Sequence, residues 1–139
     1  MTRLVIGVGN PARGDDGAGV AVAERMDPRG LTATAPFQLV ELWEGSDDVV
    51  VIDAARSGGR PGTIHRFEVG SQALPTGVLG GSTHAIGVAE VVELARAMGR
   101  LPARLTVYGI EVGEMSQGGA LSPEVEAAVG AVVAEVSDA

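Results

Sequence analysis

Residues 49–53 read Val-Val-Val-Ile-Asp, four consecutive aliphatic side chains followed by a carboxylate. Residues 4–8, Leu-Val-Ile-Gly-Val, form a second run of the same kind. A short apolar run without alternation is typical of a strand that is buried on both faces of a parallel sheet. Helices must cover both faces of such a sheet. The two runs therefore predict an α/β fold.

Helical and extended patterns alternate along the rest of the chain. Further strands are expected over residues 31–35, 63–69 and 105–110, and the second of these has the mixed pattern of an edge strand. A loop over residues 9–14 is expected to precede a helix capped by Asp15 or Asp16, and the other helices are expected over residues 36–44, 83–98 and 122–136. We therefore expect one domain over residues 1–139, a doubly wound sandwich with a mostly parallel sheet of about five strands and helices on both faces.

The composition excludes several classes of protein. There is no cysteine, which removes disulfides, thiolate metal sites and cysteine nucleophiles. Eighteen acidic residues against ten basic ones give a net charge of −8, which repels nucleic acid backbones. No apolar run approaches the ~18 residues of a membrane span, and no signal-peptide pattern precedes the first strand. We expect a soluble, intracellular protein that binds neither nucleic acid nor membranes.

Candidate ligands gather where the winding of the sheet is expected to reverse, since ligands of open α/β sheets bind at the carboxyl ends of the strands there. Asp15 and Asp16 follow the first strand, Asp53 ends the third, and His84 is expected to begin the helix before the last strand. A charge at the end of an apolar strand is costly to bury unless it is paired or coordinated. Carboxylates with an imidazole suit a divalent metal such as zinc, manganese, iron, cobalt or nickel. Simpler roles as helix caps or structural residues remain open for Asp15, Asp16 and His84.

Two other chemistries are less favoured. Residues 7–14 are glycine-rich, but Ala12 stands where a dinucleotide fingerprint has its third glycine, and the chain has no lysine for a phosphate loop. A nucleotide or small-molecule binder remains an alternative that predicts affinity insensitive to changes at Asp53 and His84. No Gly-x-Ser-x-Gly elbow supports a serine triad, and His65 is expected to be an ordinary edge-strand residue.

Short motifs occur in a fixed order along the whole chain. They are Gly7-Val8-Gly9-Asn10, Gly14-Asp15-Asp16-Gly17-Ala18-Gly19-Val20, Asp53-Ala54, Ser82-Thr83-His84, Tyr108-Gly109-Ile110-Glu111 and Leu121-Ser122-Pro123-Glu124-Val125. Together they resemble the [NiFe] hydrogenase maturation endopeptidases. The segment at 31–37 departs from that family, whose members commonly have a glycine-bearing loop there. Recognition of the substrate is expected to differ in this region.

The resemblance implies a cytoplasmic hydrolase that removes the C-terminal extension of a hydrogenase large-subunit precursor after nickel insertion. The metal-binding residues of the family fall on Asp16, Asp53 and His84. These residues either contact nickel that the precursor carries or hold a metal of their own, and other divalent metals are expected to bind in vitro. The resemblance also suggests a monomer that meets its precursor transiently.

Two details stay open at this stage. Asp16 or Asp53 can serve as the general base toward water. Arg56, Ser57 and Gly58, which follow Asp53, can contact a peptide, although Arg56 also suits a plain surface charge. The alternative to a protease is a nickel-sensing or metal-chaperone module with the same three ligands and no cleavage.

Overall fold

The computed structural model describes residues 3–26, 28–70, 73–75, 78–79, 86–113 and 121–137. Its strands are β1 Leu4–Val8, β2 Gly30–Ala33, β3 Asp48–Ala55, β4 Ile64–Val69 and β5 Arg104–Glu111. Its α-helices are α1 Ala18–Arg25, α2 Leu39–Trp43, α3 Val88–Ala97 and α4 Pro123–Ser137. Two 3-10 helices, η1 Pro11–Gly17 and η2 Pro36–Gln38, precede α1 and α2.

The five strands form one sheet in the order β2-β1-β3-β5-β4. Strands β1, β2, β3 and β5 are parallel, and β4 pairs antiparallel with β5 at one edge. The chain moves outward from β1 to β2 and then crosses back to β3, so the winding reverses between β1 and β3. This confirms the predicted α/β fold and places the ligand-binding edge at the carboxyl ends of these two strands.

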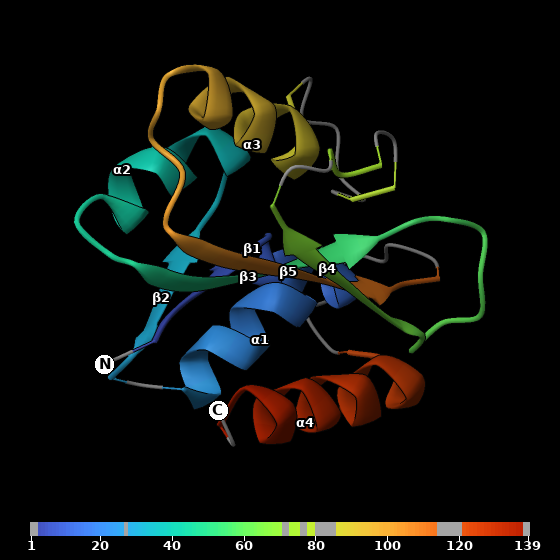
Figure 1. The fold of residues 1–139 in the computed structure, drawn as a ribbon. Coiled ribbons are helices and arrows are strands. Elements are labelled where there is room, and N and C mark those ends of the chain that lie inside the picture. Colours follow the sequence, from blue (N-terminus) through green and yellow to red (C-terminus); the bar gives the residue numbers. More distant parts are fainter. Residues whose placement is uncertain are drawn as a thin grey trace.

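Helices cover both faces of the sheet, with α2 and α3 on one side and α1 and α4 on the other (Figure 1). Alternate residues of each strand enter opposite cores, as strand geometry requires. In β3, Val49 and Val51 pack under α2 and α3, whereas Val50 and Ile52 pack against α1 and α4. All four side chains are at most 1% exposed, which confirms the interpretation of residues 49–52 as a strand buried on both faces.

Two helix starts differ from the sequence-based expectation. Residues 11–17 form η1 instead of continuing a loop, because Asn10 caps it by accepting the Ala12 N–H at 3.0 Å. Neither Asp15 nor Asp16 is therefore the cap of α1, which begins at Ala18 after Gly17.

The third α-helix also begins later than expected. It starts at Val88, with Gly87 at its cap position donating its N–H to Glu90 Oε1 at 2.9 Å, so His84 does not begin it. Ser82, Thr83 and His84 lie outside the described residues. Within the described part of the chain, no helix has the length and apolar character needed to cross a membrane.

Candidate functional site

Glycines bring the start of α1 into backbone contact with the ends of β1 and β3. A Cβ at Gly19 would lie 2.3 Å from the Ile52 carbonyl oxygen and 2.7 Å from that of Val8. A Cβ at Gly9, whose φ is +150°, would lie 2.0 Å from the Asp16 carbonyl oxygen. Only glycine allows so close an approach. This packing holds η1, and with it Asp16, against the carboxyl end of the sheet.

Asp53 lies in β3 at this end and is 2% exposed. Its Oδ1 accepts the N–H of Ala54 at 2.8 Å, but among the described residues its buried Oδ2 has no hydrogen-bond partner. The other unpartnered buried atoms in that part of the chain belong to Arg3 and Asp48, which form an ion pair of 3.5 Å at the start of the sheet. An unsatisfied buried carboxylate oxygen is costly, so Asp53 points to a missing ligand.

The electrostatics of Asp53 agree with this interpretation. Burial raises the pKa of Asp53 from 3.8 to about 8, opposed by the Ala54 hydrogen bond and assisted by the negative charge of Asp16. Asp16 is itself buried, and its Oδ2 accepts the Asn10 N–H at 3.1 Å. Two neighbouring carboxylates in a desolvated position repel each other, and a cation relieves both the repulsion and the desolvation.

The donor set therefore fits a divalent cation, with oxygen ligands and an open acceptor position. The described residues alone do not contain a group of three or more His, Asp or Glu side chains arranged to hold a metal. The third predicted ligand, His84, lies in the segment outside them. The residues that flank this segment do meet the site: Leu79 bridges to Ala55 of β3, and a Cβ at Gly87 would lie 3.6 Å from the Leu79 carbonyl oxygen.

Asp15, the neighbour of Asp16, has a structural partner. Its Oδ1 accepts the N–H of Ser122 at 2.7 Å and its Oδ2 accepts the Ser122 hydroxyl at 2.9 Å. Since Ser122 immediately precedes α4, this contact ties η1 to the start of the last helix. Both oxygens of Asp15 are thus satisfied, and Asp16 is the acid that stands beside Asp53.

The sequence analysis missed a second buried carboxylate, Glu111, at the end of β5. Glu111 is 1% exposed; its Oε2 accepts the Ser57 N–H at 2.8 Å, and its Oε1 accepts the Ser57 hydroxyl at 2.6 Å and His65 Nε2 at 2.9 Å. Burial acts to raise the pKa of Glu111, but the hydrogen bonds from Ser57 and His65 outweigh it, and the pKa falls below its usual value. We call these three residues the Glu111 cluster.

The cluster brings a serine, a histidine and a carboxylate together, but not as a catalytic triad. The Ser57 hydroxyl donates to Glu111 and not to an imidazole, and His65 also contacts Glu111, so the Ser–His hydrogen bond of a triad is absent from this cluster. His65, expected to be ordinary, instead contacts a fully buried charge. Two signals in the sequence were the placement of Glu111 directly after the expected strand 105–110, much as Asp53 follows 49–52, and its position at the end of the motif that begins at Tyr108.

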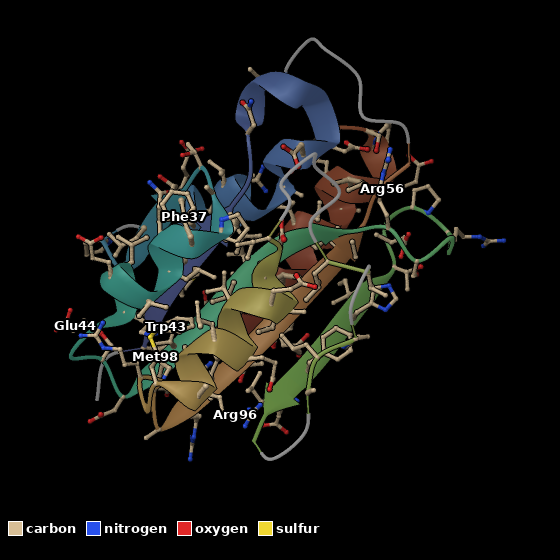
Figure 2. The ribbon with its side chains drawn as sticks, turned by 90° about the horizontal axis from the view of Figure 1, so that it is seen from above. Phe37, Trp43, Glu44, Arg56, Arg96 and Met98 are labelled. Atoms are coloured by element: carbon tan, nitrogen blue, oxygen red, sulfur yellow. The ribbon has the colours of Figure 1, made fainter. Side chains whose placement is uncertain are left out.

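A hollow of about 260 Å³ lies at the other end of the sheet, lined by Trp43, Glu44, Arg100 and neighbouring residues. Figure 2 shows Trp43, Glu44 and Met98 together on one side of the molecule and Arg56, in the loop after β3, on the other. The hollow is therefore remote from Asp53 and is not the candidate site.

Comparisons with known proteins identify the family of the chain. A family model described as hydrogenase maturation protease matches residues 32–139. The chain belongs to this family. HupD of Rhodobacter capsulatus, a hydrogenase expression/formation protein, is 31% identical over 142 residues, covering 95% of this chain and 68% of HupD. The hydrogenase 2 maturation protease of Escherichia coli is 30% identical over 142 residues, covering 93% of this chain and 84% of that protein.

Solved structures of the family share the fold. The E. coli hydrogenase maturating endopeptidase HybD superposes with a TM-score of 0.76 at 25% identity, covering 98% of this chain and 90% of HybD. The [NiFe] hydrogenase maturation protease HybD from Thermococcus kodakarensis gives 0.75 at 27% identity, covering 99% and 98%. These relatives are named as proteases, which confirms the resemblance seen in the motifs and the assignment to the hydrolases.

Proposed function

We propose that this protein is an endopeptidase that removes the C-terminal extension of a [NiFe] hydrogenase large-subunit precursor after nickel insertion. It acts in the cytoplasm as a monomer that meets the precursor transiently. The observation that carries the proposal is the unpartnered, buried Oδ2 of Asp53 beside Asp16, at the switch point of a maturation-protease fold. The carboxyl group of Asp53, which is costly to ionise, thus lies at the edge of the sheet where α/β proteins bind their ligands.

Nickel is the metal that we assign to this site, carried there by the precursor or bound by Asp16, Asp53 and His84. Asp16 and Asp53 supply the carboxylates, and other divalent metals with a preference for oxygen and nitrogen are expected to bind in vitro. A divalent cation at this position supplies Lewis-acid polarisation of the scissile carbonyl. The support for His84 comes from two described residues on either side of it: Leu79 bridges to Ala55 at the end of β3, and Gly87 lies close to the Leu79 carbonyl oxygen.

The residues of the chain itself supply positioning and proton transfer. Asp53 is fixed inside β3, where the ladder to β5 continues on both sides of it, and Asp16 is fixed by its bond to Asn10. With a pKa of about 8, the Asp53 carboxyl holds a proton at pH 7, and a cation must displace that proton to bind. Once ionised, Asp53 or Asp16 can accept the proton of an attacking water.

The test is the intact mass of a nickel-loaded large-subunit precursor after incubation with the parent protein and, separately, with His84→Ala. We expect the parent to release one discrete C-terminal peptide, no release when nickel is omitted, and impaired release by the variant. Asp15→Asn is the matched control, because Asp15 is a buried acid next to Asp16 that bonds only to Ser122 in the described structure; this variant should still process the precursor. An uncut precursor in a nickel-dependent complex would contradict the protease and favour a nickel-sensing module.

A further inference from the structure

Glu111 is a buried ionised side chain that the site described above does not use. In the sheet register, Asp53 lies opposite Gly109, Ala55 lies opposite Glu111, and His65 of β4 lies opposite Gly109 from the other side. Partners in register project to the same face of a sheet. Asp53, His65 and Glu111 therefore all face the α3 side, at the edge where the candidate site lies.

Glu111 holds both ends of one loop, residues 56–63, which connects β3 to β4. At the start of the loop, its carboxylate accepts both the N–H and the hydroxyl of Ser57. At the end of the loop, its backbone carbonyl accepts the Gly62 N–H and its backbone N–H donates to the Thr63 carbonyl, each at 2.8 Å. This loop begins three residues after Asp53, so the residue that fixes it also fixes the surface beside the site.

The loop is exposed, although a buried charge holds it in place. Residues 56–61 are all exposed, whereas Glu111 is 1% exposed. Burying a carboxylate costs several kcal/mol of desolvation, and apolar contacts can stabilise a loop equally well. A buried carboxylate that accepts three directional hydrogen bonds also fixes the geometry of the loop.

The loop also presents a cation to this edge of an acidic molecule. Arg56 is exposed, its Nη2 donates to the Gly113 carbonyl at 3.2 Å, and its backbone N–H donates to the Val78 carbonyl at 2.7 Å. In the described part of the chain, no acid forms an ion pair with Arg56, so the rest of its guanidinium can donate to a ligand. Carbonyl and carboxylate oxygens of a peptide are the acceptors that such a group binds.

We propose that Glu111 is a positioning residue which, through Ser57 and His65, fixes the 56–63 loop as a binding surface for the C-terminal extension of the precursor, with Arg56 as the peptide contact. The inference rests on the function proposed above. Asp53 is held by the β3 and β5 ladder and not by the loop, so loosening the loop weakens precursor binding and leaves the chemical step intact.

The first test compares steady-state processing of the nickel-loaded precursor by the parent, Glu111→Gln and Arg56→Ala. Each variant should raise KM about tenfold while kcat stays within about twofold. The double variant should be little worse than Arg56→Ala alone, because Glu111 acts through the loop that presents Arg56. Asp15→Asn and Arg100→Ala are the matched controls, one a buried acid that anchors another segment and the other an exposed arginine at the opposite end of the sheet; neither should change KM.

The second test is independent of peptidase activity. Trypsin should cut the Arg56–Ser57 bond of folded Glu111→Gln at least about tenfold faster than that of the parent, while cleavage at Arg100–Leu101 is unchanged. A merely destabilised variant would show faster cleavage at both bonds, since global unfolding exposes both.

The outcomes separate the two proposals. A parent that leaves the precursor uncut contradicts the proposed function and the peptide-binding role of the loop together, while the trypsin comparison still decides whether Glu111 holds the loop. A parent that cuts the precursor, with KM unchanged in Glu111→Gln and Arg56→Ala, overturns the inference and leaves the proposed function standing. Equal trypsin cleavage of parent and Glu111→Gln at Arg56–Ser57 also overturns it.

Discussion

Asp53 and Glu111 are two carboxylates in nearly the same place with opposite properties. Each follows apolar residues in the carboxyl-terminal part of its strand, on the same face and edge of the sheet, and each is at most 2% exposed. Within the described part of the chain, Asp53 receives one hydrogen bond, from its neighbour Ala54, and its pKa rises to about 8. Glu111 receives three, from Ser57 and His65, and its pKa falls below the usual value. Both side chains are almost unexposed, but desolvation and the negative charge of Asp16 raise the pKa of Asp53, whereas the donors Ser57 and His65 lower that of Glu111. Desolvation, donors and neighbouring charge together separate the two carboxylates.

The difference separates a ligand site from a structural anchor. A carboxylate whose oxygens accept hydrogen bonds from the protein stabilises the fold in its ionised form. A buried carboxylate with an oxygen that accepts no hydrogen bond is unfavourable in its ionised form unless a cation binds. We therefore assign Asp53 to the precursor's metal and Glu111 to the loop beside it, and each prediction below tests that division.

The largest expected effect is on processing by Asp53→Asn. An amide has no negative charge for a cation and cannot accept a proton from water, so the rate of precursor processing should fall by about 100-fold or more. The measurement is single-turnover release of the C-terminal peptide at saturating nickel-loaded precursor. Parent-like release by this variant would remove Asp53 from the working site.

The second effect is on the stability of the metal-free protein. The folded-state pKa of Asp53 is raised from 3.8 to about 8, so between these values the folded state holds a proton that the unfolded state has lost. The contribution of Asp53 to unfolding free energy should then fall as pH rises, by up to ~1.4 kcal/mol per pH unit, and level off above pH 8. In urea titrations without metal, Asp53→Asn should be more stable than the parent at pH 8 and nearly equal at pH 4. A variant that is less stable than the parent at pH 8 would contradict this assignment.

Glu111→Gln should change stability in the opposite direction. The ionised carboxylate is favoured in the folded state, so its stabilisation is present above the usual pKa of 4.5 and is lost as pH falls through the lower folded value. We expect the variant to lose about 1–3 kcal/mol of unfolding free energy at pH 7 and less in acid. Urea denaturation at both pH values checks this, and a variant that is as stable as the parent at pH 7 would show that the hydrogen bonds contribute nothing.

The smallest effect is expected for Asp15→Asn. Asp15 accepts two hydrogen bonds from Ser122, and an amide keeps one acceptor oxygen, so the loss should be about 1 kcal/mol. Thermal unfolding should show a modest decrease in Tm, with precursor processing unchanged. A large loss of processing would mean that Asp15 and not Asp16 belongs to the site.

The sequence predicted the fold because its decisive signals are local. The apolar runs at 4–8 and 49–52 define the central strands. The position of Asp53 directly after the second run indicated that its charge would be costly to bury. The start of η1 was missed because a side chain that caps a helix, here Asn10, was read as part of a loop.

The Glu111 cluster was missed for a different reason. Ser57 and His65 lie 54 and 46 residues from Glu111 in the chain, and only strand pairing brings them together. A sequence can indicate which carboxylates are buried. Whether the oxygens of such a carboxylate have hydrogen-bond donors depends on residues that are distant in the chain.

The most direct test of the division between the two acids is a carboxyl-carbon NMR titration of the metal-free protein, with Asp53 and Glu111 assigned from Asp53→Asn and Glu111→Gln. The account predicts that Asp53 titrates with a midpoint near 8 and that Glu111 titrates below 4.5. An Asp53 that is already ionised at pH 5 would show that its empty oxygen carries no cost, and would contradict its assignment as the position that a cation fills.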